Sequence, residues 1–244
     1  MLILFNIFAQ SEEADKITVS ANYLLTSVNF SIWYDVPGSI LTWRDIYLHG
    51  FHLNVDFPKA PFGFDKNNVG IGFSSSFHGY WTDDDANNDI NAISVSTAKT
   101  TLLELKYEML GNKSVFNPKL GFDFNMLSFK NYDSRPFSGK PFRDWQGIEG
   151  LASGYDIYKL GFYGGVQAVY GNSIIYMEAS GQIGVGIYLA LGNWMNNPNY
   201  KNPISFSDSG FSFRGGSGLE TGLKLDRFTF FCKALLVSRT WNDY

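Results

Sequence analysis

The sequence contains few charged residues, few prolines and a single cysteine. Charged side chains make up 17% of its 244 residues, whereas soluble domains average about 25%. The lone Cys232 excludes an internal disulfide framework. With 8 prolines against 25 glycines, the composition is not collagen-like. At 45% hydrophobic residues, the chain is also too apolar to be disordered.

Further absences exclude whole classes of function. The formal net charge is −4 without a basic block, so we expect no nucleic-acid partner. The best apolar run, residues 183–191, is shorter than the roughly 18 residues that a spanning helix needs. The sequence has no nucleophile elbow, metal-spaced His/Cys cluster or phosphate-binding loop. We therefore expect no cofactor and no bound metal, and Cys232 is interpreted as a small apolar residue.

What the chain does have is aromatic residues and a hydrophobic period of two. It contains 22 Phe, 14 Tyr and 6 Trp. Leu103, Leu105 and Tyr107 alternate with Glu104 and Lys106, which is typical of a β-strand with one apolar face. The same pattern predicts strands within residues 17–36, 47–57, 69–77, 103–109, 120–126, 158–168, 175–191, 211–225 and 228–236.

The connections between these strands alternate in length. Residues 35–45, 81–93, 132–156 and 192–203 form long connections, and those between them are shorter. Long loops at one end and short turns at the other are typical of outer-membrane barrels. The sequence therefore predicts an all-β, antiparallel, up-and-down transmembrane β-barrel of about ten strands. A soluble β-sandwich is the alternative, since alternation by itself fits both.

The strand count predicts a defect in the barrel. Nine strands are found, whereas bacterial single-chain barrels have an even number. Either one strand escapes this count, or a closing strand is missing; in the second case we expect an open or mispaired seam between the first strand and residues 227–241.

The N-terminus predicts export. Residues 1–9 are apolar, Ala9 is a candidate cleavage position and polar residues follow, as in a signal peptide that lacks its basic start. We interpret residues 1–9 as a signal-peptide remnant and residues 10–244 as a single β-barrel domain in the cell outer membrane. The alternative for residues 1–9 is a buried first strand.

Three local motifs carry a resemblance to a known family. They are residues 41–45 (LTWRD), 79–85 (GYWTDDD) and 202–206 (NPISF). With the strand order and loop alternation, residues 17–241 resemble the omptins, ten-stranded outer-membrane proteases of the aspartate type. The resemblance implies a tall barrel with an extracellular cleft, two acidic residues on one wall and an Asp–His pair on the other. Water activated there would attack a peptide carbonyl.

Only one of those two walls has a counterpart in this chain. Asp83 and Asp85, with Asp84 between them, match the acidic wall; a solvated acidic loop tip is the alternative interpretation. Residues 192–200, where the Asp–His pair would fall, contain neither histidine nor carboxylate. His78 is the one histidine near the acidic run, so Asp83, Asp85 and His78 are the only catalytic candidates. Because the general base is missing, the sequence favours a protein without proteolytic activity.

The favoured function is structural or binding. The longest predicted loop, residues 132–156, carries Trp145, Arg135 and Arg143 as a candidate contact surface for lipopolysaccharide, a protein partner or another ligand. Membrane lipid is the other expected partner. An omptin-like endopeptidase and a narrow solute channel are the alternative functions.

Ten further charged residues are expected inside the barrel, where they form a salt-bridge network or, alternatively, line a solute path. His52 is expected to point inward and His49 outward. The inward charged set is Glu104, Lys106, Glu108, Asp123, Lys159, Glu178, Arg214, Glu220, Lys224 and Lys233.

Overall fold

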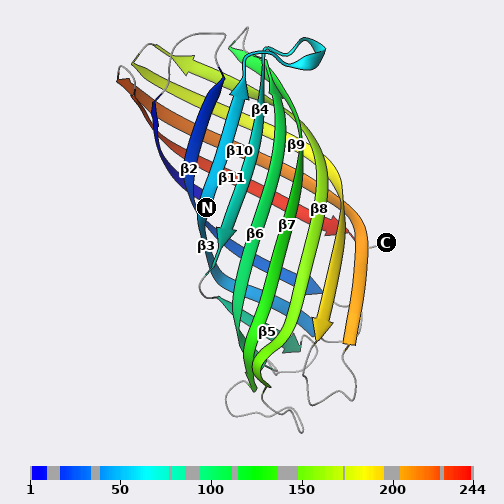
Figure 1. Ribbon diagram of the computed structural model, residues 1–244. Helices are drawn as coiled ribbons and strands as arrows, with labels where there is room; N and C mark the ends of the chain where they lie inside the picture. The colour runs from blue at the N-terminus through cyan, green and yellow to red at the C-terminus, as the bar shows by residue number, and fades with distance from the viewer. Residues whose placement is uncertain are drawn as a thin grey trace.

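The fold is a single antiparallel β-sheet (Figure 1). The computed structural model describes residues 2–9, 17–33, 39–76, 79–85, 94–111, 115–136, 148–172, 174–194, 204–225 and 228–242. Within these ranges the only helix is a short 3₁₀ turn, η1 (Pro61–Gly63), and no helix is long and apolar enough to cross a membrane. The strands are β1 (Leu2–Ala9), β2 (Thr18–Trp33), β3 (Ser39–Phe57), β4 (Lys66–Ser75), β5 (Tyr80–Asp85), β6 (Ser94–Leu110), β7 (Phe116–Pro136), β8 (Ile148–Gly171), β9 (Ile175–Trp194), β10 (Ile204–Leu225) and β11 (Phe228–Asn242).

The topology is up-and-down, as the sequence predicts. From β6 to β11 every strand pairs antiparallel with the next along the chain. β4 and β5 each lie between β3 and β6. β4 pairs with one half of β3, and β5 pairs with the other half. The sheet curls, and β11 passes behind β6 and β7 in Figure 1. The all-β, antiparallel part of the predicted fold class is confirmed.

The predicted open seam is wrong along β1. Leu2–Ala9 pair with residues 228–235 of β11, and Ile3, Leu4 and Phe5 pair with residues 23–25 of β2. This short apolar segment therefore lies between the first and last predicted strands, paired along its length with β11 and at three positions with β2. Residues 1–9 were interpreted above as a signal-peptide remnant, with a first strand as the alternative. Strand pairing does not test removal after export, so the signal peptide stays a prediction.

Burial along the strands inverts the usual arrangement of a soluble protein. On β6, Leu105 is 41% exposed, whereas Glu108 is 5% exposed. We call the face that carries Leu103 and Leu105 the outer face and the opposite one the inner face. Many apolar side chains of the outer face are exposed, among them Phe51, Ile71, Phe73, Phe122, Phe162, Ile183, Val185, Ile187, Phe211 and Phe213. Soluble sheets bury such side chains instead.

A second region of the sheet has the ordinary arrangement. Toward the ends of β3, β6, β7, β8 and β9 that the long connections join, the inner face is apolar. Its cluster comprises Ile46, Leu48, Ala98, Phe129, Tyr155, Ile157, Tyr188 and Ala190. On the outer face of the same region, Lys99 and Lys130 are exposed and lie directly opposite each other on β6 and β7. The hydrophobic core therefore occupies one end of the inner face.

Candidate functional site

Charged and polar side chains fill the rest of the inner face. Their positions follow from the antiparallel register, which places Lys106 beside Asp123 and Glu108 beside Gly121. Further along the same ladder, Tyr163 stands between Gly121 of β7 and Gly184 of β9. Because strand side chains alternate between faces, all of these positions except the glycines project inward.

Two groups of ion pairs lie side by side on this face. Glu108 pairs with Lys106 and Lys119, and Asp123 pairs with Arg214 of β10. Glu108 and Asp123 are each 5% exposed. Burying a charged side chain destabilises the folded state unless the charge is paired. The ion pairs with Lys106, Lys119 and Arg214 therefore lower the cost of burying Glu108 and Asp123. We call these five residues the inner ion network.

Tyr163 links the two groups. The guanidinium carbon of Arg214 lies 4.6 Å from the centroid of the Tyr163 ring, and the Lys119 ammonium lies 5.7 Å from it. These distances are typical of cation–π contacts. Toward the short turns the polar interior continues, where the Tyr176 hydroxyl donates to Glu220 over 2.7 Å.

The predicted inward orientation of the charged set is confirmed where the structure describes the side chains. Of that set, the side chains of Lys224 and Lys233 lie outside the described part. The members that are buried or half-buried on the inner face are Glu104, Lys106, Glu108, Asp123, Lys159, Glu178, Arg214 and Glu220.

The glycines of the inner face make room for the network. A Cβ added to Gly121 would lie 2.5 Å from the Tyr163 ring and 2.7 Å from the backbone oxygen of Tyr107. Gly121→Ala is therefore expected to lower the free energy of unfolding by about 1–3 kcal/mol, because Tyr163 must leave its place between the ions. Gly181→Ala, whose Cβ meets no atom within 4 Å, is the control. Urea unfolding in detergent micelles measures the stability of both variants. Equal stability would show that the close packing of Tyr163 over Gly121 does not contribute to the fold.

The histidines occupy the faces that the sequence predicts. His49 is exposed on the outer face, where its Nδ1 lies 2.7 Å from the Tyr23 hydroxyl. His52 is half-buried on the inner face and lies over Gly70 and Gly72. In the part of the chain that the structure describes, no group of three or more metal-binding side chains occurs.

The sequence-predicted catalytic candidates are placed only in part. Asp83 and Asp85 belong to β5 and pair with Leu41 and Ser39 of β3; Asp83 also pairs with Ser94 of β6. Their side chains, and His78 altogether, lie outside the described residues. The acidic run therefore lies within β5, which pairs with β3 on one side and β6 on the other.

The candidate contact surface is also placed only in part. Arg135 lies within β7, opposite Val95 of β6, because β7 extends to Pro136. It therefore lies in a strand and not in the predicted loop. Arg143 and Trp145 lie outside the described residues.

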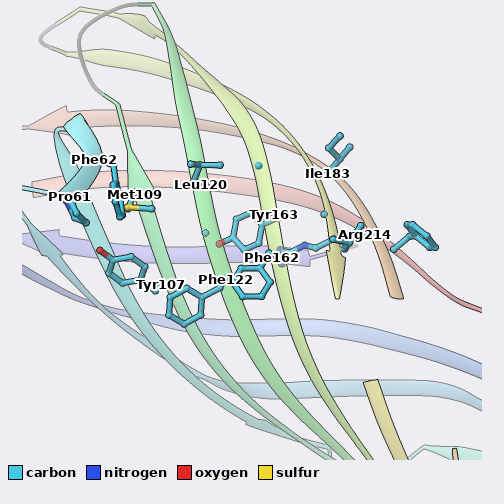
Figure 2. Close-up of a pocket in the computed structure, with 15 residues that line it drawn as sticks. Pro61, Phe62, Tyr107, Met109, Leu120, Phe122, Phe162, Tyr163, Ile183 and Arg214 are labelled. Carbon is cyan, nitrogen blue, oxygen red and sulfur yellow. The ribbon is translucent and has the colours of Figure 1, made fainter. Parts of the chain in front are cut away.

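Sequence reasoning missed a groove on the outer face. It has a volume of about 810 Å³. Figure 2 shows Phe62 on the turn after β3 beside Met109 and Tyr107 at one end of the groove, and Ile183 at the other. The apolar side chains that line it are Pro61, Phe62, Tyr107, Met109, Leu120, Phe122, Phe162, Ile183, Val185 and Phe213. The sequence feature that could have indicated this groove is Gly164, which interrupts the row of apolar side chains on the outer face of β8.

No protein-family model matches this chain, and neither does any curated protein.

Proposed function

We propose that this protein is an integral β-barrel of the outer membrane, and that it has a structural or binding function and no enzymatic activity. The observation that carries the proposal is the inverted burial of the sheet: exposed apolar side chains outside and buried, paired ions inside. In water the exposed apolar surface would cost roughly 25 cal/mol per Å². In a bilayer the same surface faces lipid, and charges are placed toward the interior.

The outer face has a defined upper border, which supports a membrane-facing belt. On the outer face, one row of residues that are paired from strand to strand is apolar. This row consists of Phe51, Phe73, Leu103, Met126 and Tyr158. From β3 to β8 the next row toward the long connections, the polar ladder, is polar and runs across His49, Ser75, Thr101, Ser128 and Asp156; it continues into the apolar Leu25 on β2 and Leu191 on β9. Lys99 and Lys130 follow above it. We place the border between hydrocarbon and water at the polar ladder.

The pairing of the strands supports closure into a barrel. β1 connects β11 to β2, and β2 pairs with β3, so the ladder returns to its starting point. β4 and β5 share one position in this circuit, so the 11 strands of the sheet correspond to ten positions in the proposed barrel. Closure is what a bilayer demands, because an unpaired strand edge in lipid leaves backbone groups without partners.

The apolar end of the inner face favours a sealed barrel over a solute channel. Ile46, Leu48, Ala98 and Phe129 are each 0% exposed although they project inward. Water does not reach these side chains, whereas a conducting path requires a wet lining at every level. The inner ion network then serves as packing that satisfies buried charges.

The contact function is assigned to the long connections. Trp145 and Arg143, with Arg135 at the edge of β7, provide an aromatic ring and two guanidinium groups, which suit phosphates of lipopolysaccharide or an acidic partner. An omptin-like endopeptidase remains the alternative, with Asp83 and Asp85 as its carboxylates. Residues 192–200, where the resemblance places the Asp–His pair, contain neither histidine nor carboxylate to act as its general base.

Membrane insertion gives the proposal a direct test. The refolded protein should require detergent for solubility and should migrate faster on gels before heating than after it, because a closed barrel resists unfolding by detergent alone. The control is the same sample after boiling. A protein that stays soluble and monodisperse without detergent would refute the membrane proposal.

A further inference from the structure

The apolar surface of the outer face continues without interruption to the short turns. On β7 every outer position from Met126 down to Phe116 is apolar. On β9 the outer positions from Leu189 down to Ile175 are apolar or glycine. On these two strands the polar ladder therefore has no counterpart at the short-turn end.

The height of this apolar surface matches the thickness of a bilayer. From Phe116 to Met126 the strand advances by 10 residues, which is about 34 Å along the strand at ~3.4 Å per residue. A strand tilt of about 40° reduces this length to roughly 26 Å along the membrane normal, and the apolar band of an outer-membrane barrel is about 25 Å tall. If the polar ladder marks one border of the hydrocarbon, the other border falls at Phe116.

Short connections with exposed apolar side chains lie at this second border. They join β3 to β4, β6 to β7 and β8 to β9, and they lie at the upper end of the sheet in Figure 1. Five apolar side chains on or beside these connections are each more than half exposed: Phe62, Val115, Phe116, Tyr170 and Ile174. We call these five residues the apolar rim. In water such a surface is unfavourable, so the rim calls for a covering partner.

Hydrogen bonds tie the connections of the rim to the neighbouring strands and to one another. The Asp65 amide, after the first connection, donates to a backbone carbonyl of β6 over 3.1 Å. The Val169 amide, near the end of β8, donates to the Val115 carbonyl over 3.1 Å. In the third connection the Asn172 side-chain oxygen accepts from the Ile174 amide over 2.8 Å. The rim therefore keeps its shape without a ligand, and its apolar side chains stay at the surface.

We propose that the apolar rim lies in the head-group region of the bilayer leaflet at the short-turn end, so that phospholipid is what covers it. The inference rests on the proposed membrane location and adds the depth at which the barrel sits. Two observations identify lipid as the partner: the rim continues the apolar belt with no polar row between them, and the belt ends at the rim after the height of one bilayer. Tyr170 also suits this boundary, because its ring is apolar and its hydroxyl is polar.

Fluorescence quenching in lipid vesicles tests the depth of the rim. The full chain with Cys232→Ala receives a single cysteine by Ile174→Cys or by Phe62→Cys, and the cysteine is labelled with nitrobenzoxadiazole. The vesicles consist of phosphatidylethanolamine and phosphatidylglycerol. The quenchers are a nitroxide at the lipid head group, a nitroxide at the middle of the acyl chain, and iodide on both sides of the bilayer. At both rim positions the head-group nitroxide should quench most, and quenching by iodide should be lost.

Two exposed positions on other parts of the barrel provide matched controls. A label at Leu105→Cys, in the belt, should be quenched most by the mid-chain nitroxide, and a label at Glu149→Cys, at the opposite end of β8, by iodide. Iodide quenching at residue 174 as strong as at residue 149 would overturn the inference, because the rim would then stand in water and be free for a protein partner. Stronger quenching at residue 174 by the mid-chain nitroxide would overturn it too, since the rim would lie within the hydrocarbon.

Failure of the membrane proposal gives a different result from failure of this inference. If neither nitroxide quenched the label at residue 105, the belt would not face lipid, and the membrane proposal itself would be refuted. If residue 105 behaved as expected and only the rim positions did not, the barrel would span the bilayer at another depth.

Discussion

Replacing Glu108 by alanine is expected to lower the free energy of unfolding by about 3–5 kcal/mol, because it leaves two lysines without their buried partner. Lys106 and Lys119 both pair with this carboxylate. The side chain of Lys119 is 14% exposed, so water cannot fully replace the lost contact. The effect should exceed that of any single exposed charge, since exposed pairs contribute about 0–1 kcal/mol.

Urea unfolding in micelles measures the Glu108→Ala effect. Lys130→Ala is the control, since its side chain is exposed on the outer face. Replacing Lys106, Glu108 and Lys119 together by methionine should restore most of the stability, because apolar substitution of a whole buried ion group is often neutral or stabilising. If Glu108→Ala were as stable as Lys130→Ala, the inner ion network would not contribute to the fold.

A positive charge in the apolar belt should be nearly as damaging. Leu105→Arg places a guanidinium on the outer face of β6, where the leucine is 41% exposed. If lipid covers this position, the substitution should cost about 2–4 kcal/mol near the bilayer midplane. Thr101→Arg, on the same strand and face but in the polar ladder, should cost about 0–1 kcal/mol.

Folding into lipid vesicles compares these two arginine variants. The stability difference should disappear if the belt faces water, because an exposed Leu→Arg change on a soluble sheet is usually within about 0.5 kcal/mol. Equal stability of Leu105→Arg and Thr101→Arg would therefore contradict a lipid-facing position of Leu105. The comparison does not depend on the identity of any partner.

The orientation of the inner charged residues was predictable from local geometry alone. Successive side chains of a strand point to opposite faces, so Glu104 and Lys106 had to lie opposite Leu103 and Leu105 wherever the sheet was placed. The same reasoning separated His49 from His52. The partners of these charges were not predictable, because Asp123 meets Arg214 only through the register of three intervening strand pairs.

Two features were not decided by sequence reasoning, for different physical reasons. β1 was only the alternative interpretation of residues 1–9, because a short apolar segment at the N-terminus has the composition of a leader and of a strand alike; its pairing with β2 and β11 shows the strand. The outer groove was hidden because it joins the Pro61–Gly63 turn to Gly164, about one hundred positions further along the chain. No local pattern reports such a contact.

The sequence by itself determined the centres of most strands and which face their side chains take, because both depend on neighbours within a few positions. It did not determine the strand ends: residues 39–45, 81–85, 132–136 and 148–156, predicted as connections, belong to β3, β5, β7 and β8. The tertiary structure decided what those faces enclose. It placed the apolar cluster around Phe129 at one end of the interior and the Glu108 and Asp123 ion pairs along the rest, and it brought Phe62 against β6. These arrangements depend on how far each strand slides along the next, and the register is set by the packing of the whole sheet.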